Sequence, residues 1–514
     1  MRSISSDSLA QYERLGDVML DAFRHYADRC AMVDEHEAVS YGQLEQRIAH
    51  VTTVLARQGV GSGDVIAQLA GNSISMFSVM AAAYILGARS VTLHPMAGLA
   101  DHLAVIEACS PACIVTESYY AERAGQLRAR TASCIPWFSH DIGTSFPCLY
   151  EGDSYDVENL RVYGAPETII RLAFTGGTSG RSKGVMLSNR AMLTNTRLWL
   201  AGLHWPDAVR TLCMAPISHG AGSFIYPTLV KGGTVYLRRK FTPDAWFDMV
   251  ENHQIQHTFI VPTMLYGVLD HPRIHTANLS SLSALVYGAA PMASHRIVQA
   301  MQRFGHALVQ TYGQTEAPNT ILILDGQAHH SDIPDIVHSA GKPFPGLEVA
   351  LLSDQGEPVP QGDVGEICVK GDLLMSGYLD NPELTQQTIT DGWLRTGDLA
   401  RQDQYGNYFI VDRKKDMIIT GGFNVYPREI EDVLVTHPQV EQAAVVGMPD
   451  EKWGEAVKAV IVPKKKTNVD KQSLIDYVKE HKGSVYAPKI IEFVDQLPLT
   501  GLGKIDKKSL VSAF

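Results

Sequence analysis

The pattern of apolar and polar positions over residues 165–320 predicts βα units. Short apolar runs, typical of buried strands, alternate with stretches in which apolar residues recur every three or four positions, as on one face of a helix. Strands that alternate with helices in this way form a largely parallel sheet covered on both faces. The runs are IIRLAF, TLCMAPI, HTFIVP, ALVYGA and ALVQTYG, and the helical stretches are DAWFDMVENHQI and ASHRIVQAMQRFG.

The rest of the first 412 residues fits the same α/β class. YGQLEQRIAHVTTVLARQG predicts an amphipathic helix before the strand DVIAQLA. From about residue 337 to 412, short strands separated by turns indicate a β-rich subdomain, as in GLEVALLSDQGEPVPQGDVGEICVKG. We therefore expect residues 1–412 to form a large N-terminal domain of parallel-rich sheets and helices that includes this subdomain.

The pattern changes again after VDRKKD, residues 411–416. The chain that follows holds its own helices, REIEDVLVTH and KQSLIDYVKEH, and its own strands, QAAVVGM and AVKAVIVP. A run of this size is long enough for a small domain with a core of its own. We expect a short polar hinge at residues 413–416 and a C-terminal α+β domain at 417–514.

The composition excludes several classes of protein. The 514 residues are 45% hydrophobic and 19% charged, as in a globular protein with more than one domain. A net charge of -11 argues against a nucleic-acid partner, because phosphate backbones are bound by clustered basic side chains. The longest apolar stretch, VMAAAYILGA, is too short to span a bilayer and predicts a buried helix instead. The first 20 residues lack a signal-peptide core. We expect a cytoplasmic protein with free thiols and no structural metal.

The stretch RLAFTGGTSGRSKGV, residues 171–185, combines four glycines with hydroxyl residues and Lys183. Glycines let several backbone N–H groups turn toward one anion, so the stretch fits a phosphate cradle; the alternative is a plain turn between a strand and a helix. It is not a Walker loop, because Ser182 precedes Lys183 and Gly184 follows it.

FTGGTSGRSKGV resembles the phosphate-loop signature of the adenylate-forming (AMP-binding) superfamily, which includes acyl-CoA synthetases, luciferases and peptide-synthetase adenylation domains. Four later stretches resemble further motifs of that superfamily in the expected order. These are TYGQTEA (311–317), GWLRTGDLA (392–400), DRKKDMIITGGFNVYPREIE (412–431) and PLTGLGKIDKKSL (498–510). The chain most resembles the acyl- and aryl-CoA synthetase type.

The resemblance implies a site for ATP and Mg²⁺. Tyr312 would stack on adenine, Thr315 would contact the α-phosphate, and Glu316 would hold Mg²⁺. Asp398 would bind both ribose hydroxyls with the support of Arg413. The residues implied at the phosphates are Thr175, Gly176, Gly177, Thr178, Ser179, Gly180 and Lys183, although Gly176 and Ser182 stand where Ser and Pro are more usual.

Lys504 corresponds to the catalytic lysine of the family. Lys415 corresponds to the hinge residue about which a mobile C-terminal domain turns. The lysine charge offsets the repulsion between a carboxylate and the α-phosphate in the transition state. Coenzyme A is the implied acceptor, with Gly421, Gly422 and Phe423 along a pantetheine tunnel. One departure is that Val485 and Tyr486 replace an aromatic residue and a lysine found in many relatives, so a charge toward CoA is missing there.

The acid pocket is less well specified. Acetate-specific relatives carry tryptophan where this chain has Gly313, so we expect an open pocket for an aryl, arylpropenoic, medium-chain or long-chain acid. No basic residue in these stretches is placed to pair a second carboxylate. The residues implied at the pocket are His219, Gly220, Tyr287, Gly288, Ala289, Ala290, Gly313 and Gln314, and Gly313 is implied at the nucleotide as well.

The resemblance therefore predicts an ATP-dependent acid–CoA ligase that works through an acyl-adenylate. Three alternatives stay open: a free-standing ligase that loads a carrier protein, a luciferase-like oxygenase, and a non-catalytic nucleotide-binding protein. The chain ends in SAF and lacks the SKL terminus of peroxisomal proteins, which disfavours the oxygenase. The sequence leaves open whether two copies form a homodimer.

Overall fold

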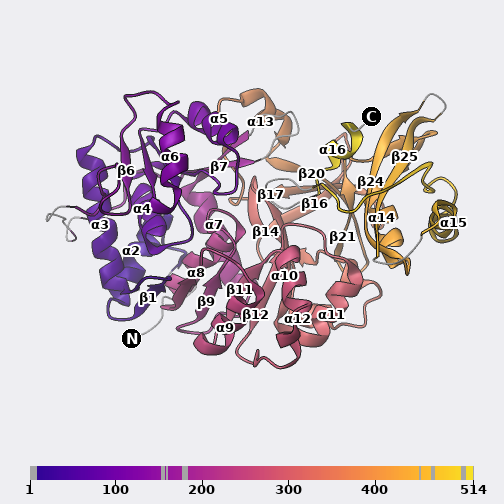
Figure 1. Ribbon diagram of the computed structural model, residues 1–514, viewed down its shortest axis with the longest axis horizontal. Helices are drawn as coiled ribbons and strands as arrows, with labels where there is room; N and C mark the ends of the chain where they lie inside the picture. Colours follow the sequence, from indigo (N-terminus) through magenta and orange to yellow (C-terminus); the bar gives the residue numbers. More distant parts are fainter. Residues whose placement is uncertain are drawn as a thin grey trace.

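The computed structural model describes residues 9–151, 157, 160–175, 183–450, 453–464, 469–498 and 505–512. These residues form an α/β structure with four β-sheets, which confirms the predicted fold class. Two large mixed sheets and a smaller sheet make up the part of the chain before residue 414, and the fourth sheet follows it (Figure 1).

The largest sheet has nine strands in the order β15-β14-β13-β12-β11-β9-β10-β1-β2. The strands from β1 to β13 in this order are parallel, and β2, β14 and β15 are antiparallel to their neighbours. The strands are β1 (Cys30–Val33), β2 (Ala38–Ser40), β9 (Arg210–Cys213), β10 (Thr234–Leu237), β11 (His257–Ile260), β12 (Ala284–Gly288), β13 (Leu308–Gln314), β14 (Ala317–Leu324) and β15 (Lys342–Pro343).

The second large sheet has seven strands in the order β18-β8-β7-β4-β3-β5-β6. Its strands are β3 (Val65–Leu69), β4 (Arg89–Thr92), β5 (Cys113–Thr116), β6 (Trp137–Ser139), β7 (Ile169–Thr175), β8 (Lys183–Ser188) and β18 (Gly377–Tyr378). One expectation is corrected here. The run IIRLAF is β7, which belongs to this sheet and pairs antiparallel with β8, so it is not part of the sheet formed by the strands after residue 209.

Helices fill three layers around the two large sheets. The central layer packs between the sheets in one apolar core: α2 (Leu15–His25), α3 (Tyr41–Arg57), α4 (Ile74–Leu86), α7 (Asn189–Gly202) and α8 (Ile225–Val230). α9 (Pro243–His253), α10 (Pro262–Leu269) and α11 (Ser294–Phe304) cover the outer face of the nine-stranded sheet, next to α12 (Gly326–His329). α5 (Leu99–Cys109) and α6 (Ala121–Arg128) cover the outer face of the seven-stranded sheet (Figure 1).

Local chemistry explains where the two best-predicted helices of the first domain begin. α3 starts with a capping box, in which Ser40 accepts the Gln43 N–H and the Gln43 side chain accepts the Ser40 N–H. α4 begins after the N-cap Ser73 and ends at Gly87 with φ +68°. All of α4 except Ser75 is buried, as its uninterrupted apolar run predicts. Within the described ranges no helix is long and apolar enough to cross a membrane.

The predicted β-rich segment forms a five-stranded sheet, with β16 (Glu348–Leu352), β17 (Gly365–Lys370), β20 (Trp393–Gln402) and β19 (Ile389–Thr390) in order and β21 (Tyr408–Arg413) beside β20. α13 (Pro382–Thr388) interrupts the segment. Two of its shortest strands leave it, because β15 pairs with β14 and β18 pairs with β8. The segment is therefore joined to both large sheets.

The chain after residue 417 forms the fourth sheet, with β23 (Phe423–Val425), β22 (Ile418–Thr420), β25 (Gly454–Pro463) and β24 (Val440–Asp450) in order and β26 (Ile490–Phe493) beside β25. α14 (Pro427–Thr436) and α15 (Lys471–Lys482) pack on one face and α16 (Lys507–Ser512) on the other (Figure 1). Each face has its own apolar cluster.

Candidate active site

The hairpin of β13 and β14 brings the TYGQTE segment to the RTGD segment. Tyr312, near the end of β13, donates its hydroxyl hydrogen bond to Asp398 Oδ2 at 2.6 Å. The other carboxylate oxygen, Oδ1, lies 3.3 Å from Arg413 Nε, because β20 and β21 pair Asp398 with Arg413. Burial, and then the Asp398 charge, raise the pKa of Tyr312 well above its ordinary value, so the phenol stays a hydrogen-bond donor at neutral pH.

Asp398 is accessible only in part. Its side chain is 12% exposed, whereas that of Arg413 is 55% exposed. A carboxylate oxygen has more than one lone pair, so the Asp398 carboxylate has the chemistry to accept hydrogen bonds from hydroxyl groups. Asp398 is therefore a fixed acceptor at the edge of a site. Its position requires three strands, because Tyr312 lies on β13, Asp398 on β20 and Arg413 on β21.

The turn after β13 brings Glu316 to Tyr378. The Tyr378 hydroxyl donates to Glu316 Oε1 at 2.8 Å, and the Lys183 Nζ lies 5.4 Å from the centre of the Tyr378 ring. Burial, and then the Glu316 charge, raise the pKa of Tyr378, so it too remains a neutral donor. The Met375 N–H also donates to the Glu316 backbone oxygen at 2.8 Å. Tyr378 thus connects the predicted phosphate-binding lysine to the predicted metal-binding carboxylate.

Tyr378 was not among the predicted site residues. It lies on the two-residue strand β18, which reaches the site only because β18 pairs with β8, with Tyr378 opposite Val185. No periodicity marks so short a strand. The available signal in the sequence was the phenol itself in SGYLDNP, next to Gly377 with φ +141°.

Two parts of the predicted site lie outside the described residues. Gly176, Gly177, Thr178, Ser179 and Gly180 belong to the segment that joins β7 to β8, whose last pair is Thr175 opposite Lys183. The segment therefore connects two antiparallel strands, which corrects the alternative of a turn between a strand and a helix.

Lys504 is the second part. The described residues on either side of its segment are joined, because the Asp506 N–H donates to the Pro498 carbonyl oxygen at 2.8 Å.

The expectation of open space at Gly313 is wrong. A Cβ at this position would lie 2.6 Å from Asn319 Cα, well inside van der Waals contact with the backbone of β14. Asn319 bulges toward Gly313 with φ +54°, between the Tyr312–Leu322 and Gln314–Ala317 pairs. Glycine is required here by the close approach of two strands, so it carries no information on the size of the acid.

The residues predicted at the acid pocket divide into two groups: His219, Gly220 and Ala289 lie after strand ends, whereas Tyr287 and Gly288 lie within β12. His219 is exposed on the loop after β9, its Nδ1 is 3.0 Å from Ser218 Oγ, and its ring meets the His94 ring edge to face at 5.1 Å. A Cβ at Gly220 would lie 2.9 Å from the Phe259 ring of β11. Ala289 is exposed at the end of β12, with φ +68°, an uncommon backbone conformation for alanine.

Tyr287 does not fit its predicted place. Its side chain is 1% exposed and packs in the apolar cluster under α9–α11, whereas Val286 faces the central core together with Phe259. The Tyr287 hydroxyl donates to Gln310 Oε1 at 2.9 Å and lies 3.2 Å from His329 Nε2. Alternation along β12 therefore turns Tyr287 away from His219, and Gly288 is a glycine because its Cβ would meet the Thr311 backbone oxygen.

The predicted CoA-binding residues lie on the hairpin of β22 and β23. Gly421 and Gly422 have φ +57° and +82°, and the Gly421 N–H donates to the Trp453 carbonyl at 2.8 Å. Phe423 and Trp453 are 59% and 40% exposed, so this face presents aromatic surface. Lys415 is exposed between this hairpin and β21. Val485 and Tyr486 pack against the domain core, so these positions supply packing and no charge.

Comparison with known proteins agrees with the geometry. A model of the AMP-binding enzyme family matches residues 20–379, and a model of the AMP-binding enzyme C-terminal domain matches residues 429–504. A medium/long-chain-fatty-acid–CoA ligase, FadD8 of Mycobacterium tuberculosis, is 39% identical over 97% of this chain and 90% of its own length. A feruloyl-CoA synthase of an Amycolatopsis species is 36% identical over 93% and 94%.

Among solved structures, the amide bond synthetase McbA from Marinactinospora thermotolerans superposes with a TM-score of 0.90. It is 32% identical, and the match covers 96% of this chain and 98% of that one.

Proposed function

This chain belongs to the AMP-binding enzyme family, and we propose that it is an ATP-dependent acid–CoA ligase built around the contacts of Tyr312 and Tyr378. A carboxylate oxygen of the acid attacks the α-phosphorus of ATP, pyrophosphate leaves, and an acyl-adenylate forms. The CoA sulfur then attacks the acyl carbon, AMP leaves, and the thioester forms. ATP, Mg²⁺ and CoA are the cofactor and co-substrates of this reaction.

One observation carries the proposal for the nucleotide. Two chains of contacts, Lys183–Tyr378–Glu316 and Tyr312–Asp398–Arg413, start from the same hairpin turn. They bring together four of the five motifs found in the sequence. Asp398 binds the ribose hydroxyls, Arg413 supports it, and Tyr312 lies against the adenine. Lys183 and the residues from Thr175 to Gly180 hold the β- and γ-phosphates.

Glu316 suits Mg²⁺ because a carboxylate oxygen is a hard ligand, and its Oε1 is oriented by the Tyr378 hydroxyl. When bound, Mg²⁺ neutralises phosphate charge. Thr315 contacts the α-phosphate, and Lys504 supplies the positive charge that lets the acid carboxylate approach it. Binding acid and ATP at adjacent places converts a bimolecular attack into an oriented one.

The proposed acid is larger than acetate, and this now rests on the relatives. Their names specify medium- and long-chain fatty acids and ferulate, which are long or aromatic carboxylic acids. His219, Gly220, Ala289, Ala290 and Gln314 line the acid side. Gly313 no longer contributes to this inference, because the Asn319 backbone occupies the space in front of it.

The proposed acceptor is CoA. Gly421, Gly422 and Phe423 face the pantetheine after the C-terminal domain, residues 417–514, turns about Lys415 within the hinge 413–416. Residues 1–412 hold ATP and the acid throughout. Because its co-substrates are ATP and CoA, we place the enzyme in the cytoplasm. Loading of a carrier protein is the second candidate, favoured by a relative, 28% identical over 96% of this chain, that is a fatty acid–acyl-carrier-protein ligase.

The test is acid-dependent exchange of pyrophosphate into ATP, with acids from acetate to palmitate and with cinnamate, coumarate and ferulate. CoA, a phosphopantetheinylated carrier protein and a simple amine are then added separately to the best acid. We expect exchange with long or aromatic acids and product with CoA alone. If exchange occurs but no thioester forms with CoA, or if product forms only with the carrier protein or the amine, CoA is not the acceptor.

A further inference from the structure

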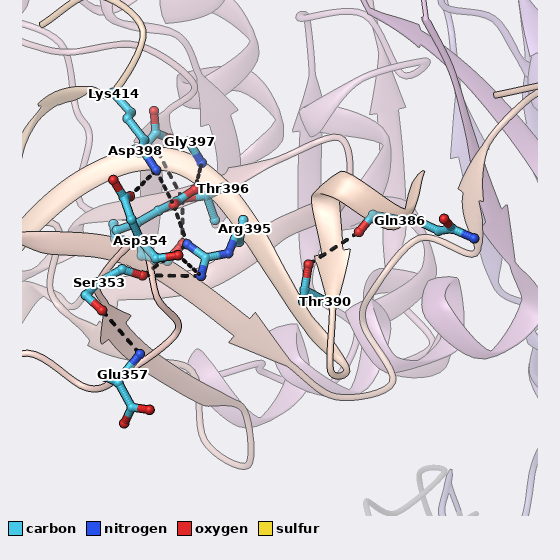
Figure 2. A network of polar contacts seen from close by, with 12 residues as sticks. Ser353, Asp354, Glu357, Gln386, Thr390, Arg395, Thr396, Gly397, Asp398 and Lys414 are labelled. Carbon is cyan, nitrogen blue, oxygen red and sulfur yellow. Dashed lines mark hydrogen bonds and ion pairs between the residues drawn. The ribbon is translucent and has the colours of Figure 1, made fainter. Parts of the chain in front are cut away.

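A buried glutamate lies behind the proposed ribose-binding aspartate. Glu366, on β17, has a side chain that is 5% exposed. It accepts hydrogen bonds from residues just before Asp398 on β20 and from Lys414, which follows β21. Its Oε1 accepts the Gly397 N–H at 3.0 Å. Its Oε2 accepts Arg395 Nη1 at 2.9 Å and lies 3.3 Å from Lys414 Nζ. Figure 2 shows Arg395, Gly397 and Lys414 gathered beside Asp398.

The Gly397 peptide is held from both sides. Glu366 binds its N–H, and the Lys414 N–H donates to its carbonyl oxygen at 2.9 Å. The neighbouring Thr396 hydroxyl donates to the Ile367 carbonyl at 2.8 Å and accepts the Asp398 N–H at 3.1 Å. Gly397 has φ +74°, which a residue with a side chain adopts only with strain. The backbone that carries Asp398 is thus fixed to β17 at successive residues.

Glu366 does not contact the surface at which Asp398 and Arg413 meet. Among the described residues, its carboxylate makes polar contacts with Arg395, Gly397 and Lys414, and none of these three is implied at the nucleotide by the sequence. Arg395 also donates to the Ser353 carbonyl oxygen, and Lys414 pairs with Asp354 (Figure 2). The network is therefore a support beneath the site rather than a part of it.

We infer that Glu366 is a positioning residue for nucleotide binding, which holds Asp398 where its carboxylate meets the ribose hydroxyls by binding Gly397 and Lys414. This rests on the proposed role of Asp398 in binding ribose. Glu366 acts before the nucleotide arrives, so that binding does not have to order the 395–398 segment. An ordered acceptor loses less entropy on binding than a mobile one.

The negative charge of Glu366 is essential to this role. Two cations share Oε2 and the Gly397 N–H binds Oε1, so a neutral amide would turn its NH₂ group toward either the cations or the Gly397 N–H. Burial opposes the charged form of Lys414, but its hydrogen bonds to Asp354 and Glu366 outweigh burial and raise its pKa. Lys414 therefore stays charged and keeps Asp354 as a partner when Glu366 is neutralised. Arg395, whose side chain is only 19% exposed, loses its carboxylate partner beside the Gly397 peptide.

The experiment measures the dissociation constant for AMP by calorimetry, with displacement titration for weak variants. Glu366→Gln is compared with the wild type, and the double variant Glu366→Gln/Asp398→Ala with Asp398→Ala alone. Glu357→Gln is the matched control, because Glu357 is an exposed glutamate of the same subdomain (Figure 2). We expect Glu366→Gln to raise the dissociation constant about 5- to 10-fold when Asp398 is present and less than about 2-fold when it is absent. Glu357→Gln should leave it unchanged.

If Glu366 served folding alone, Glu366→Gln would change the dissociation constant for AMP equally with and without Asp398. An equal loss of affinity in both backgrounds, or no loss in either, overturns the inference while leaving the proposed function intact. If the wild type binds no AMP, the proposed function fails and the inference fails with it. Should Glu366→Gln not fold, Lys414→Met replaces it in the same comparison, because it removes one cation from Oε2 and leaves the Gly397 hydrogen bond; a loss of about 3-fold confined to the Asp398 background is expected.

Discussion

The Tyr378 side chain serves two proposed roles, one through its hydroxyl and one through its ring. It holds Glu316 at 2.8 Å, and its ring lies beneath the Lys183 ammonium at 5.4 Å. A hydrogen bond to a charged acceptor contributes about 1.5–3 kcal/mol to its orientation when partly buried. Loss of the hydroxyl alone should therefore affect the carboxylate while the ring continues to contact the lysine.

Tyr378→Phe is expected to raise the Mg²⁺ concentration needed for half-maximal pyrophosphate exchange by about 5-fold or more. The reason is that Glu316 loses the donor that orients Oε1. The measurement is exchange as a function of free Mg²⁺ at saturating ATP and acid. Tyr405→Phe is the matched control, because Tyr405 is 49% exposed and belongs to none of the five motifs. An unchanged Mg²⁺ dependence in Tyr378→Phe would remove Tyr378 from the site.

At the scale of single residues, the motifs assigned more roles than the contacts between the described residues can test. Tyr312 and Arg413 both contact Asp398, and Tyr378 joins Lys183 to Glu316, while the roles of these residues at the nucleotide stay predictions. Residues that act through them were missed, because Tyr378 and Glu366 are joined to the site by strand pairing between distant segments. No local pattern in the sequence records such a pairing.

The β13–β14 hairpin is the element that determines the shape of the site. It carries Tyr312 at one end of its turn and Glu316 within the turn, and Asn319 bulges across Gly313. The Thr311 hydroxyl and the Asn319 carbonyl are hydrogen-bonded, and Asn319 Nδ2 lies 3.4 Å from Ser223 Oγ in the 3-10 helix Gly220–Phe224 that follows His219. The hairpin thus links the proposed nucleotide side to the proposed acid side.

Gly313→Ala should lower the thermal midpoint and reduce turnover of short and long acids alike. Its Cβ would lie 2.6 Å from Asn319 Cα, so the hairpin must open and Tyr312 must move. The expected destabilisation is about 1–3 kcal/mol, as for other overpacked sites. Thermal unfolding and the acid panel measure the two effects, with Gly61→Ala as the control because a Cβ there meets nothing within 4 Å. If the variant instead shifts its preference toward short acids at an unchanged thermal midpoint, the interpretation of Gly313 as the floor of an open acid pocket is correct after all.

At the scale of elements, periodicity predicted several of the helices and strands that the structure describes. α3, α4, α9, α11, α14 and α15 lie where amphipathic or apolar runs placed them. The membership of β7 in the seven-stranded sheet was not predicted, since an apolar strand carries no label for its sheet. The open space assigned to Gly313 failed for a related reason, because a bulge on the facing strand fills it.

The two large sheets enclose a thick core that buries titratable groups. His140, just after β6, is buried, and burial lowers its pKa from 6.5 to about 4. The folded state therefore favours the neutral ring, whereas the unfolded chain protonates near 6.5. The stability that this difference contributes is complete above pH 6.5 and is lost as the pH falls toward 4.

His140→Leu removes this titration. Between about pH 6.5 and 4, the wild type is expected to lose stability relative to the variant by about 1.4 kcal/mol per pH unit. Chemical unfolding at several pH values measures the difference. A difference that stays constant with pH would mean that His140 is protonated as readily in the folded protein as in the unfolded chain.

The central claim for the whole molecule is that one site serves two reactions and that Lys504 acts in the first alone. The most direct measurement supplies Lys504→Ala with synthetic acyl-AMP and CoA, alongside the full reaction from ATP and the best acid. The account predicts that adenylation falls by about 10²–10³-fold while thioester formation from supplied acyl-AMP continues at the wild-type rate. If the folded variant loses both reactions equally, or loses neither, the assignment of Lys504 and the alternation of the C-terminal domain about Lys415 are both contradicted.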